Sequence, residues 1–515
     1  MSFPRQPQVC IPLGAGVVLI AGLVIGARGV SAVESPLPLD QSLNTARVVQ
    51  LEKGDPAVVM WRSSVATNVG AVSATATHIL LGSNNSFLGA SGASKDLGTV
   101  IGFRRMDGVR LWQFEHPRLP SRINDIPLQS IRSIPAVSNE DVFYFSNRGE
   151  LVSVSLKSGR RKWALDLVGT QNVLKRDAGD VGNPSPSPFV WKDFVFCATA
   201  NGTLNDRQGV WVPHPEAPGF VAVDRSTGRL VWKSTVANQE LMYSHWGSPS
   251  MISVGKVTQV VFPGGDGFLH GFDPETGRLE WSLDCNSPTA TQWTRRRRGT
   301  RCYFNGRPVV AEEALFVALG QEPESGGKSG EHRIVAVDLR PIGEKQPPRL
   351  HWGVPGPGSA QIRGDLCHRD RRLYALSGVD ELLVLDATNG ETLFARCVGE
   401  GDLNFGWPVI ARDRLWVPTS EALLIQRGFD DASCCCSRVP QQRGRHSRRG
   451  TPTDPQWNDL DYGVRPSSQR RIRSRKPSSC PIVLPAVPRV STLAERWGQN
   501  DECLRVRRLG SEKTV

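Results

Sequence analysis

Short apolar segments alternate with polar turn segments along most of the chain, and residues 220–233 (FVAVDRSTGRLVWK) show the design clearly. The β-branched and aromatic run 220–223 predicts a strand. Residues 224–227 predict a turn, because the Asp that starts it can bond the backbone two residues further on. Gly228 suits the left-handed position at which such a turn ends in a bulge. The segment is therefore predicted to be a β-hairpin whose second strand carries Trp232.

The spacing of this hairpin recurs along the chain as a polar residue, a Gly four residues later and an aromatic residue four further on. The copies are Arg104-Gly108-Trp112, Ser155-Gly159-Trp163, Asp224-Gly228-Trp232, Asp273-Gly277-Trp281 and Asp386-Gly390-Phe394, with a stretched copy from Asp338 to Trp352. A motif that recurs about every 50 residues predicts a repeat architecture. Four short strands with their turns fill about 40–50 residues, which is the size of one propeller blade.

The strands between these copies predict an all-β fold, a β-propeller over residues 56–427 with seven blades and with eight as the nearest alternative. Residues 205–219 interrupt the third blade and are predicted to be an insertion. The last blade has only three strands, whereas a strand around Trp61 stands isolated in the sequence. We therefore expect the strand around Trp61 to complete the last blade and close the ring, because closure removes open sheet edges.

The pattern A-x-D-x-x-T-G-x-x-x-W resembles the repeat of the pyrroloquinoline-quinone-like (PQQ-like) propellers. The longer run from GNPSPSPFVW to FLHGFDPETGRLEW is similar to the exported PQQ-binding-like proteins of planctomycete-type bacteria, and the resemblance extends over roughly residues 61–426. It implies a propeller whose tryptophans dock between neighbouring blades. The residues that it assigns to docking are Trp61, Trp112, Trp163, Trp232 and Trp281, with Gly108, Gly159, Gly228, Gly277 and Gly390 in the hairpins.

The N-terminal residues 1–32 show the pattern of an export segment. Arg5 precedes an apolar run at 11–27, and Arg28 follows it. The run predicts either the core of a signal peptide, cleaved after the small residues at 30–32, or an uncleaved membrane anchor. Both alternatives export the chain to the periplasm or the cell envelope. Residues 33–55 are polar and are predicted to be a linker.

The C-terminal residues 428–515 lose the apolar pattern. They contain 17 Lys and Arg against 9 Asp and Glu, so +8 of the formal net charge of +12 lies in this tail. Dense Arg, Ser and Pro predict disorder. The abrupt loss of the repeat leaves a shifted reading frame as an alternative. A basic tail on an exported chain is most often simply solvated, so we expect no specific nucleic-acid partner.

Two groups of residues outside the repeat are candidates for a binding surface. His245 and Trp246, in HWGSPS, would suit a ligand or peptide pocket, and packing at the start of a strand is the alternative. The four arginines Arg295, Arg296, Arg297 and Arg298 follow in a loop that could bind an acidic partner. Asp224 and Asp273 belong to the repeated turns, where an Asp caps the backbone.

The sequence favours a binding function over catalysis. It contains no GxSxG, HExxH, P-loop or kinase motif. The quinone dehydrogenases that the resemblance suggests hold PQQ and calcium at the ring axis, many with a disulfide between adjacent cysteines, yet residues 61–427 contain no adjacent cysteines and no clear cluster of acids. We therefore expect a non-catalytic, monomeric, exported scaffold that binds a protein partner in the cell envelope, similar at fold level to the propeller of the outer-membrane β-barrel assembly machinery. A PQQ-dependent dehydrogenase with calcium is the alternative.

Overall fold

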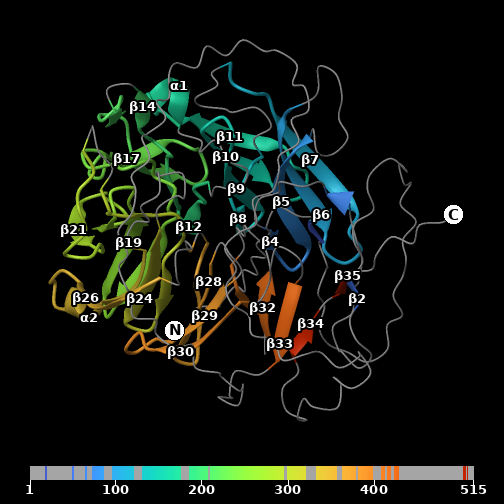
Figure 1. Cartoon of the computed structure of the whole chain (residues 1–515). Helices are drawn as coiled ribbons and strands as arrows, with labels where there is room; N and C mark the ends of the chain where they lie inside the picture. Colours follow the sequence, from blue (N-terminus) through green and yellow to red (C-terminus); the bar gives the residue numbers. More distant parts are fainter. Residues whose placement is uncertain are drawn as a thin grey trace, which may run out of the picture. The chain divides into compact units, whose positions relative to one another are not determined.

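The computed structural model describes the parts of the chain that form the repeated sheets. The described residues are 18–19, 49–50, 64–65, 72–85, 96–120, 130–175, 185–206, 209–294, 299–320, 332–356, 362, 364–377, 381–397, 407–411, 414–418, 423–427, 503–505 and 507–508. Within them the chain folds into seven antiparallel sheets of four or five strands, which we number 1 to 7 in chain order (Figure 1).

Sheets 1 to 6 are each built from strands that are close together in the sequence, as expected for a blade. Sheet 1 contains β4 (Ser73–Ala74), β5 (His78–Asn84), β6 (Gly98–Arg104) and β7 (Arg110–His116). Sheet 2 contains β8 (Ala136–Ser138), β9 (Asp141–Phe145), β10 (Glu150–Ser155) and β11 (Arg161–Asp166). Sheet 3 contains β12 (Phe189–Trp191), β13 (Phe194–Ala198), β16 (Phe220–Asp224) and β17 (Leu230–Ser234). Sheet 4 contains β18 (Ser250–Val254), β19 (Val257–Pro263), β20 (Phe268–Phe272) and β21 (Leu279–Asp284).

The remaining sheets follow the same plan with local variations. Sheet 5 contains β22 (Tyr303–Phe304), β23 (Val309–Ala311), β24 (Ala314–Gly320), β25 (Arg333–Asp338) and β26 (Arg349–Pro355). Sheet 6 contains β27 (Cys367–Arg369), β28 (Arg372–Leu376), β29 (Glu381–Asp386) and β30 (Thr392–Cys397). Sheet 7 contains β31 (Val409–Ala411), β32 (Arg414–Pro418), β33 (Leu423–Arg427) and β34 (Cys503–Arg505). The two described helices are α1 (Leu167–Gln171) and α2 (Arg340–Gly343).

The repeated turn forms as the sequence predicts. Oδ1 of Asp224 accepts hydrogen bonds from the backbone N–H groups of Ser226 (3.0 Å) and Thr227 (2.8 Å). The hydroxyls of Ser226 and Thr227 also donate to this oxygen and, together with the backbone bonds, lower the pKa of Asp224 to about 2. Gly228 has φ of +71°, and the strand register shifts by a bulge between Ala222 and Val223. The left-handed position is the one that Gly tolerates at little cost.

The tryptophan of one sheet contacts the glycine turn of the next sheet. Trp163 of sheet 2 donates its indole N–H to the carbonyl of Arg225 in sheet 3 (2.9 Å), and a Cβ added to Gly228 would lie 2.5 Å from the Trp163 ring. Trp232 of sheet 3 donates in the same way to the carbonyl of Pro274 (3.0 Å) and packs on Gly277. Each turn glycine therefore leaves the space that the neighbouring indole fills.

Two further contacts follow this pattern. Trp112 donates to the carbonyl of Leu156 (2.7 Å) and packs on Gly159. Trp352, from the stretched copy of the motif, donates to the carbonyl of Ala387 (3.1 Å) and packs on Gly390. The equivalent partner of Gly108 would be Trp61, which lies outside the described residues.

Trp281 is the exception among the repeated tryptophans. Its indole N–H donates to Oε1 of Gln259 in its own sheet (2.8 Å). The turn of sheet 5, which it would meet, is replaced by α2, and Trp281 shares a buried cluster with Leu339 and Ile342 from that region. Apolar side chains thus take the place of the glycine turn.

The fourth strand of sheet 7 differs from the sequence prediction. We expected a strand around Trp61, but β33 pairs with β34 from the C-terminal segment. An exposed strand edge accepts any extended segment whose backbone groups match it, since the pairing uses main-chain hydrogen bonds. Apart from β34 and residues 507–508, the predicted disordered tail lies outside the described residues. The all-β blade architecture is confirmed, and the number of blades stays a prediction.

Three two-stranded sheets complete the described structure. β1 (Val18–Leu19) pairs with β3 (Ser64–Val65), and β2 (Val49–Gln50) pairs with β35 (Arg507–Arg508). β14 (Leu204–Asp206) and β15 (Gly209–Trp211) form a hairpin within the predicted insertion of the third blade. Among the described residues, no helix is long and apolar enough to span a membrane. Most of the apolar run 11–27 lies outside them.

Candidate functional site

His245 lies in the interior, although the sequence suggested it for a binding surface. The side chain is fully buried. Its Nδ1 accepts a hydrogen bond from the backbone N–H of Gly265 (3.1 Å), so its Nε2 carries the proton and donates to Oδ1 of Asn238 (2.9 Å). Burial lowers the pKa of His245 to about 4. Both nitrogens of this neutral imidazole have hydrogen-bond partners, so the side chain holds the segment before sheet 4 in place and has no free nitrogen for a ligand.

Trp246 is also an interior residue. It is 2% exposed and lies within ring-contact distance of Tyr243 (5.0 Å between centroids) and Tyr303 (6.1 Å). It belongs to the buried cluster between sheets 2 and 3 and the beginning of sheet 5. The pair at 245 and 246 therefore does not form an exposed surface; the alternative, packing before a strand, describes where the structure places it.

The four arginines, Arg295 to Arg298, lie outside the described residues, but both ends of their loop are described. The backbone N–H of Thr291 bonds to Oγ1 of Thr300 (2.9 Å), and Trp293 donates its indole N–H to the carbonyl of Arg301 (3.0 Å). None of the described hydrogen bonds joins the base of this loop to His245. The arginine loop remains a prediction for a surface that binds an acidic partner.

Hydrogen bonds connect residues at the beginnings of the first strands of successive sheets. We call this set of residues the strand-start belt. Its members are Ile134, Ser187, Ser248, Ser250, Arg307, Pro308 and Asp365. Ser187 accepts from the backbone N–H of Ile134 (2.8 Å), and Ser248 accepts from that of Ser187 (3.0 Å). Ser250 donates to the carbonyl of Pro308 (2.7 Å). The belt therefore links sheets 2, 3, 4 and 5 near the beginnings of their first strands.

Arg307 and Asp365 are the charged members of the strand-start belt. Asp365 accepts from the backbone N–H of Arg307 (2.7 Å), which extends the belt to sheet 6. The guanidinium of Arg307 donates to the carbonyls of Ser187 (3.4 Å) and Pro188 (3.3 Å) and lies 5.9 Å from the ring of Phe189. Burial raises the pKa of Asp365, and the positive charge of Arg307 opposes this shift.

The Nε of Arg307 is buried and has no hydrogen-bond partner among the described residues. The guanidinium reaches from sheet 5 to sheet 3 and so connects two parts of the belt, and its unused Nε–H could donate a hydrogen bond to a carboxylate or phosphate oxygen. Sequence analysis missed this residue. The available signal was the X-Pro step that precedes several first strands, where Arg307-Pro308 stands in the position of Ser187-Pro188.

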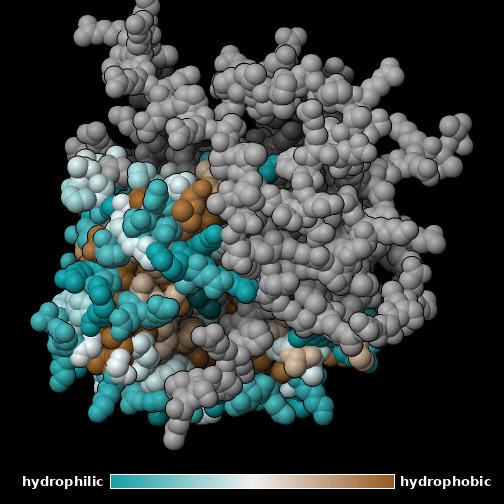
Figure 2. Space-filling model, turned by 90° about the horizontal axis from the view of Figure 1, so that it is seen from below, coloured by the Kyte–Doolittle hydropathy of each residue, from teal (hydrophilic) through white to brown (hydrophobic). Residues whose placement is uncertain are grey.

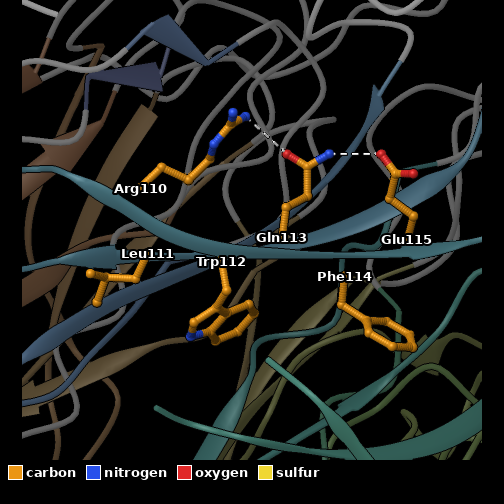
Figure 3. Close-up of a pocket in the computed structure, with 6 residues that line it drawn as sticks. All are labelled: Arg110, Leu111, Trp112, Gln113, Phe114 and Glu115. Atoms are coloured by element: carbon orange, nitrogen blue, oxygen red, sulfur yellow. Dashed lines mark hydrogen bonds between the residues drawn. The ribbon is translucent and has the colours of Figure 1, made fainter. Parts of the chain in front are cut away.

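A surface pocket of about 440 Å³ follows the edge strand β7 and is lined by residues 110–115. Figure 3 shows Arg110, Gln113 and Glu115 on one side of the strand, joined by hydrogen bonds of 3.2 Å and 2.8 Å. Trp112 and Phe114 point to the opposite side, where Trp112 is docked on the next sheet. The pocket therefore combines a row of polar side chains with the exposed apolar side chain of Leu111.

A calcium-bound quinone is the cofactor that the alternative function would require. Calcium needs several oxygen ligands that converge on one point. In the described part of the chain, no group of three or more His, Cys, Asp or Glu side chains is placed to hold a metal ion. The described tryptophans of the repeat dock on the neighbouring sheet or, for Trp281, form a hydrogen bond within their own sheet.

The comparison with protein families identifies the repeat. Residues 18–211 and 217–340, more than half of the chain, match the family described as "Outer membrane protein assembly factor BamB". The chain belongs to this family of PQQ-type repeat proteins. The match includes the hairpins of Trp112, Trp163, Trp232 and Trp281, so the resemblance inferred from the repeat spacing is confirmed.

Curated relatives are quinone-dependent dehydrogenases. The dehydrogenase subunit of the quinone alcohol dehydrogenase of Gluconobacter oxydans is 26% identical over 157 residues, which are 28% of this chain and 18% of that protein. The quinoprotein ethanol dehydrogenase of Pseudomonas putida is 27% identical over 155 residues, 28% of this chain and 22% of the relative. The matched part is thus about a fifth of the length of these relatives.

Similar solved structures come from both groups of proteins. BamB from Moraxella catarrhalis shares 15% identity, with 69% of this chain and 80% of that chain covered and a TM-score of 0.42. The quinohemoprotein alcohol dehydrogenase ADHIIG from Pseudomonas putida HK5 shares 12% identity, with 71% and 63% covered and a TM-score of 0.48.

Proposed function

We propose that this protein is a non-catalytic, exported scaffold that binds a protein partner in the cell envelope and assists the assembly of outer-membrane proteins. Membership of the BamB family supports the proposal. The structural observation that carries it is the series of tryptophan–glycine contacts, which connects sheet 1 to sheet 2, sheet 2 to sheet 3, sheet 3 to sheet 4 and sheet 5 to sheet 6 and employs the large aromatic side chains of the repeat in packing. Interlocked sheets hold their loops in fixed positions, as a binding platform requires.

The outer face of the sheets is the part offered to a partner. The exposed large apolar side chains include Met106, Leu111, Val231, Leu279 and Leu393, four of which lie on the last strands of sheets 1, 3, 4 and 6. Figure 2 shows apolar residues set between hydrophilic ones on the described part of one face. Mixed surfaces of this kind suit a reversible protein interface, with aromatic or aliphatic anchors inside a polar rim.

The location of the protein follows from the same proposal. Residues 11–27 direct the chain to the periplasm, either as the core of a cleaved signal or as an inner-membrane anchor. We propose a monomer that contacts the membrane through this segment if the segment stays uncleaved, and that has no specific nucleic-acid partner.

Depletion in the native bacterium tests the function. We expect the outer-membrane β-barrel proteins of the envelope fraction to fall in amount, and we expect the full-length chain to restore them. A chemical cross-linker applied to intact cells should join the protein to an envelope partner. Unchanged β-barrel proteins together with the absence of a cross-linked partner would contradict the scaffold function.

A quinone-dependent dehydrogenase is the second candidate, because the curated relatives carry that activity in their names. Such an enzyme would bind PQQ with calcium. We favour the scaffold, because among the described residues no group of three or more His, Cys, Asp or Glu side chains is placed to hold a metal ion.

A further inference from the structure

Ser282, His270 and Asp266 form a continuous hydrogen-bonded chain in sheet 4. His270 on β20 and Ser282 on β21 are direct cross-strand partners. Oγ of Ser282 lies 2.8 Å from Nδ1 of His270, and Nε2 of His270 lies 3.0 Å from Oδ2 of Asp266. A hydroxyl next to an imidazole that is itself oriented by a carboxylate is the arrangement that activates a serine nucleophile.

The hydrogen bonds define the direction of proton transfer. An ionised carboxylate only accepts, so Asp266 requires the proton of His270 on Nε2. Nδ1 then carries the lone pair and accepts the hydroxyl proton of Ser282. Asp266 is itself held in place, because its Oδ1 accepts from the backbone N–H of Phe268 (3.1 Å). The imidazole is thus fixed in the tautomer that a general base for Ser282 needs.

The surroundings separate the base from solvent, whereas Ser282 is an exposed residue. The side chains of His270 and Asp266 are 3% and 5% exposed. The ring of Phe220 packs at 5.8 Å from the imidazole, and the ring of Phe268 at 6.1 Å. Ser282, on the outermost strand, is exposed. A buried base behind an exposed hydroxyl lets an electrophile reach Oγ from outside the sheet.

The described chain contains a natural comparison. Thr77 and His78 also place a hydroxyl 2.8 Å from an imidazole Nδ1, but no carboxylate is bonded to that imidazole in any described contact. Ser253, an exposed serine on β18 of the same sheet, bonds to the hydroxyl of Thr258 (3.1 Å) instead of to a histidine. Thr77 has a neighbouring imidazole and Ser253 is exposed. Of these three residues, Ser282 is the one whose hydroxyl bonds to an imidazole that in turn bonds to a carboxylate.

We propose that Ser282 is a nucleophile that accepts an acyl group from carboxylic esters, with His270 as its general base and Asp266 as a positioning residue. Oγ of Ser282 bonds to the ester carbonyl carbon while its proton moves to Nδ1 of His270. The ester C–O bond then breaks, and the alcohol leaves with that proton. Water, deprotonated by the same imidazole, hydrolyses the acyl-serine and restores the hydroxyl with release of the acid.

The direct test is covalent labelling of the full-length protein with a fluorophosphonate. In this reaction Oγ bonds to phosphorus, fluoride leaves, and the proton goes to His270. We expect mass spectrometry of the digested protein to show one label per chain, on Ser282, and Ser282→Ala to lose it. Ser253→Ala and Thr77→Ala are the matched controls and should label as the wild type does.

The roles of the other two residues need a kinetic readout. Removal of a general base typically slows a reaction by about 10²–10⁴-fold, so we expect a loss of this size for His270→Gln in labelling and in hydrolysis of p-nitrophenyl acetate. Asp266→Asn should shift the pH profile of the labelling rate, because it changes the favoured tautomer, whereas a structural role would change the amount of folded protein and leave the profile in place. Circular dichroism measures the folded fraction of each variant.

Labelling of the wild-type protein tests the proposal even if a variant fails to fold. An unlabelled Ser282 in the folded wild-type protein, or labelling of Ser253 at an equal rate, would overturn it. An unchanged labelling rate in folded His270→Gln would do the same. Loss of labelling in Ser282→Ala with unchanged support of outer-membrane proteins would separate this activity from the scaffold function.

Discussion

Replacement of Gly277 by Ala tests the docking of one sheet on the next. Gly277 has φ of +73°, and a Cβ built on it would lie 2.5 Å from Cγ of Trp232. The left-handed conformation alone costs a non-Gly residue roughly 1–2 kcal/mol. The methyl group must also displace an indole that is 8% exposed and that donates to the carbonyl of Pro274 (3.0 Å).

Two effects of the added methyl group lower the free energy of unfolding further. Overpacking a filled space costs about 1–3 kcal/mol. Loss of the indole hydrogen bond, with a buried carbonyl left unpaired, costs about 1–3 kcal/mol more. Gly277→Ala should therefore lower the free energy of unfolding by at least about 2 kcal/mol more than the backbone strain alone.

Gly255→Ala is the matched control. Gly255 also has a left-handed backbone, with φ of +58°, but no described atom lies within 4 Å of the added Cβ. We expect it to show the strain of roughly 1–2 kcal/mol and nothing further. The assay is urea unfolding followed by circular dichroism, with near-ultraviolet signals reporting on the tryptophans. Equal destabilisation by the two substitutions would refute the inference that the indole fills the space above the glycine.

Three other perturbations give distinct results. Trp352→Phe removes the hydrogen bond to Ala387 (3.1 Å) and should cost about 1–3 kcal/mol in urea unfolding. His245 has a pKa of about 4 in the folded protein and 6.5 in the unfolded chain, so the unfolded chain binds more protons below pH 6.5. The free energy of unfolding therefore falls as the pH drops below 6.5, by about 3 kcal/mol at pH 4. His245→Gln should reduce this fall. Burial raises the pKa of Asp365, so its contribution to stability is lost as the pH rises through that pKa. Arg307→Met should enlarge this loss in a pH series of unfolding curves, and an unchanged series would contradict the pairing.

The local part of the fold could be predicted from the sequence. The hairpin at 220–233 depends on Asp224, Gly228 and strand-forming neighbours, all within one short segment, and turn chemistry of this kind acts locally. The same repeat also identified the tryptophans and glycines that have a structural role. Their pairing across neighbouring sheets was implied by the family resemblance, since the partners lie 35–62 residues apart.

The candidate site was less predictable, because it depends on long-range packing. His245 stands in a distinctive motif, yet Asn238 and Gly265 satisfy both of its nitrogens, and no local pattern indicates this. Trp281 keeps the repeat spacing but loses its glycine partner because α2 replaces the next turn. The pairing of β33 with β34 joins segments distant in sequence, and such pairing depends on tertiary context.

A PQQ titration of the full-length protein in the presence of Ca²⁺ tests the central claim, a scaffold without quinone catalysis, most directly. Tryptophan fluorescence reports binding, and dye reduction with a panel of alcohols and aldose sugars reports turnover. We expect no saturable quenching and no dye reduction. Saturable quenching accompanied by dye reduction would contradict it and would make the protein a quinone-dependent dehydrogenase.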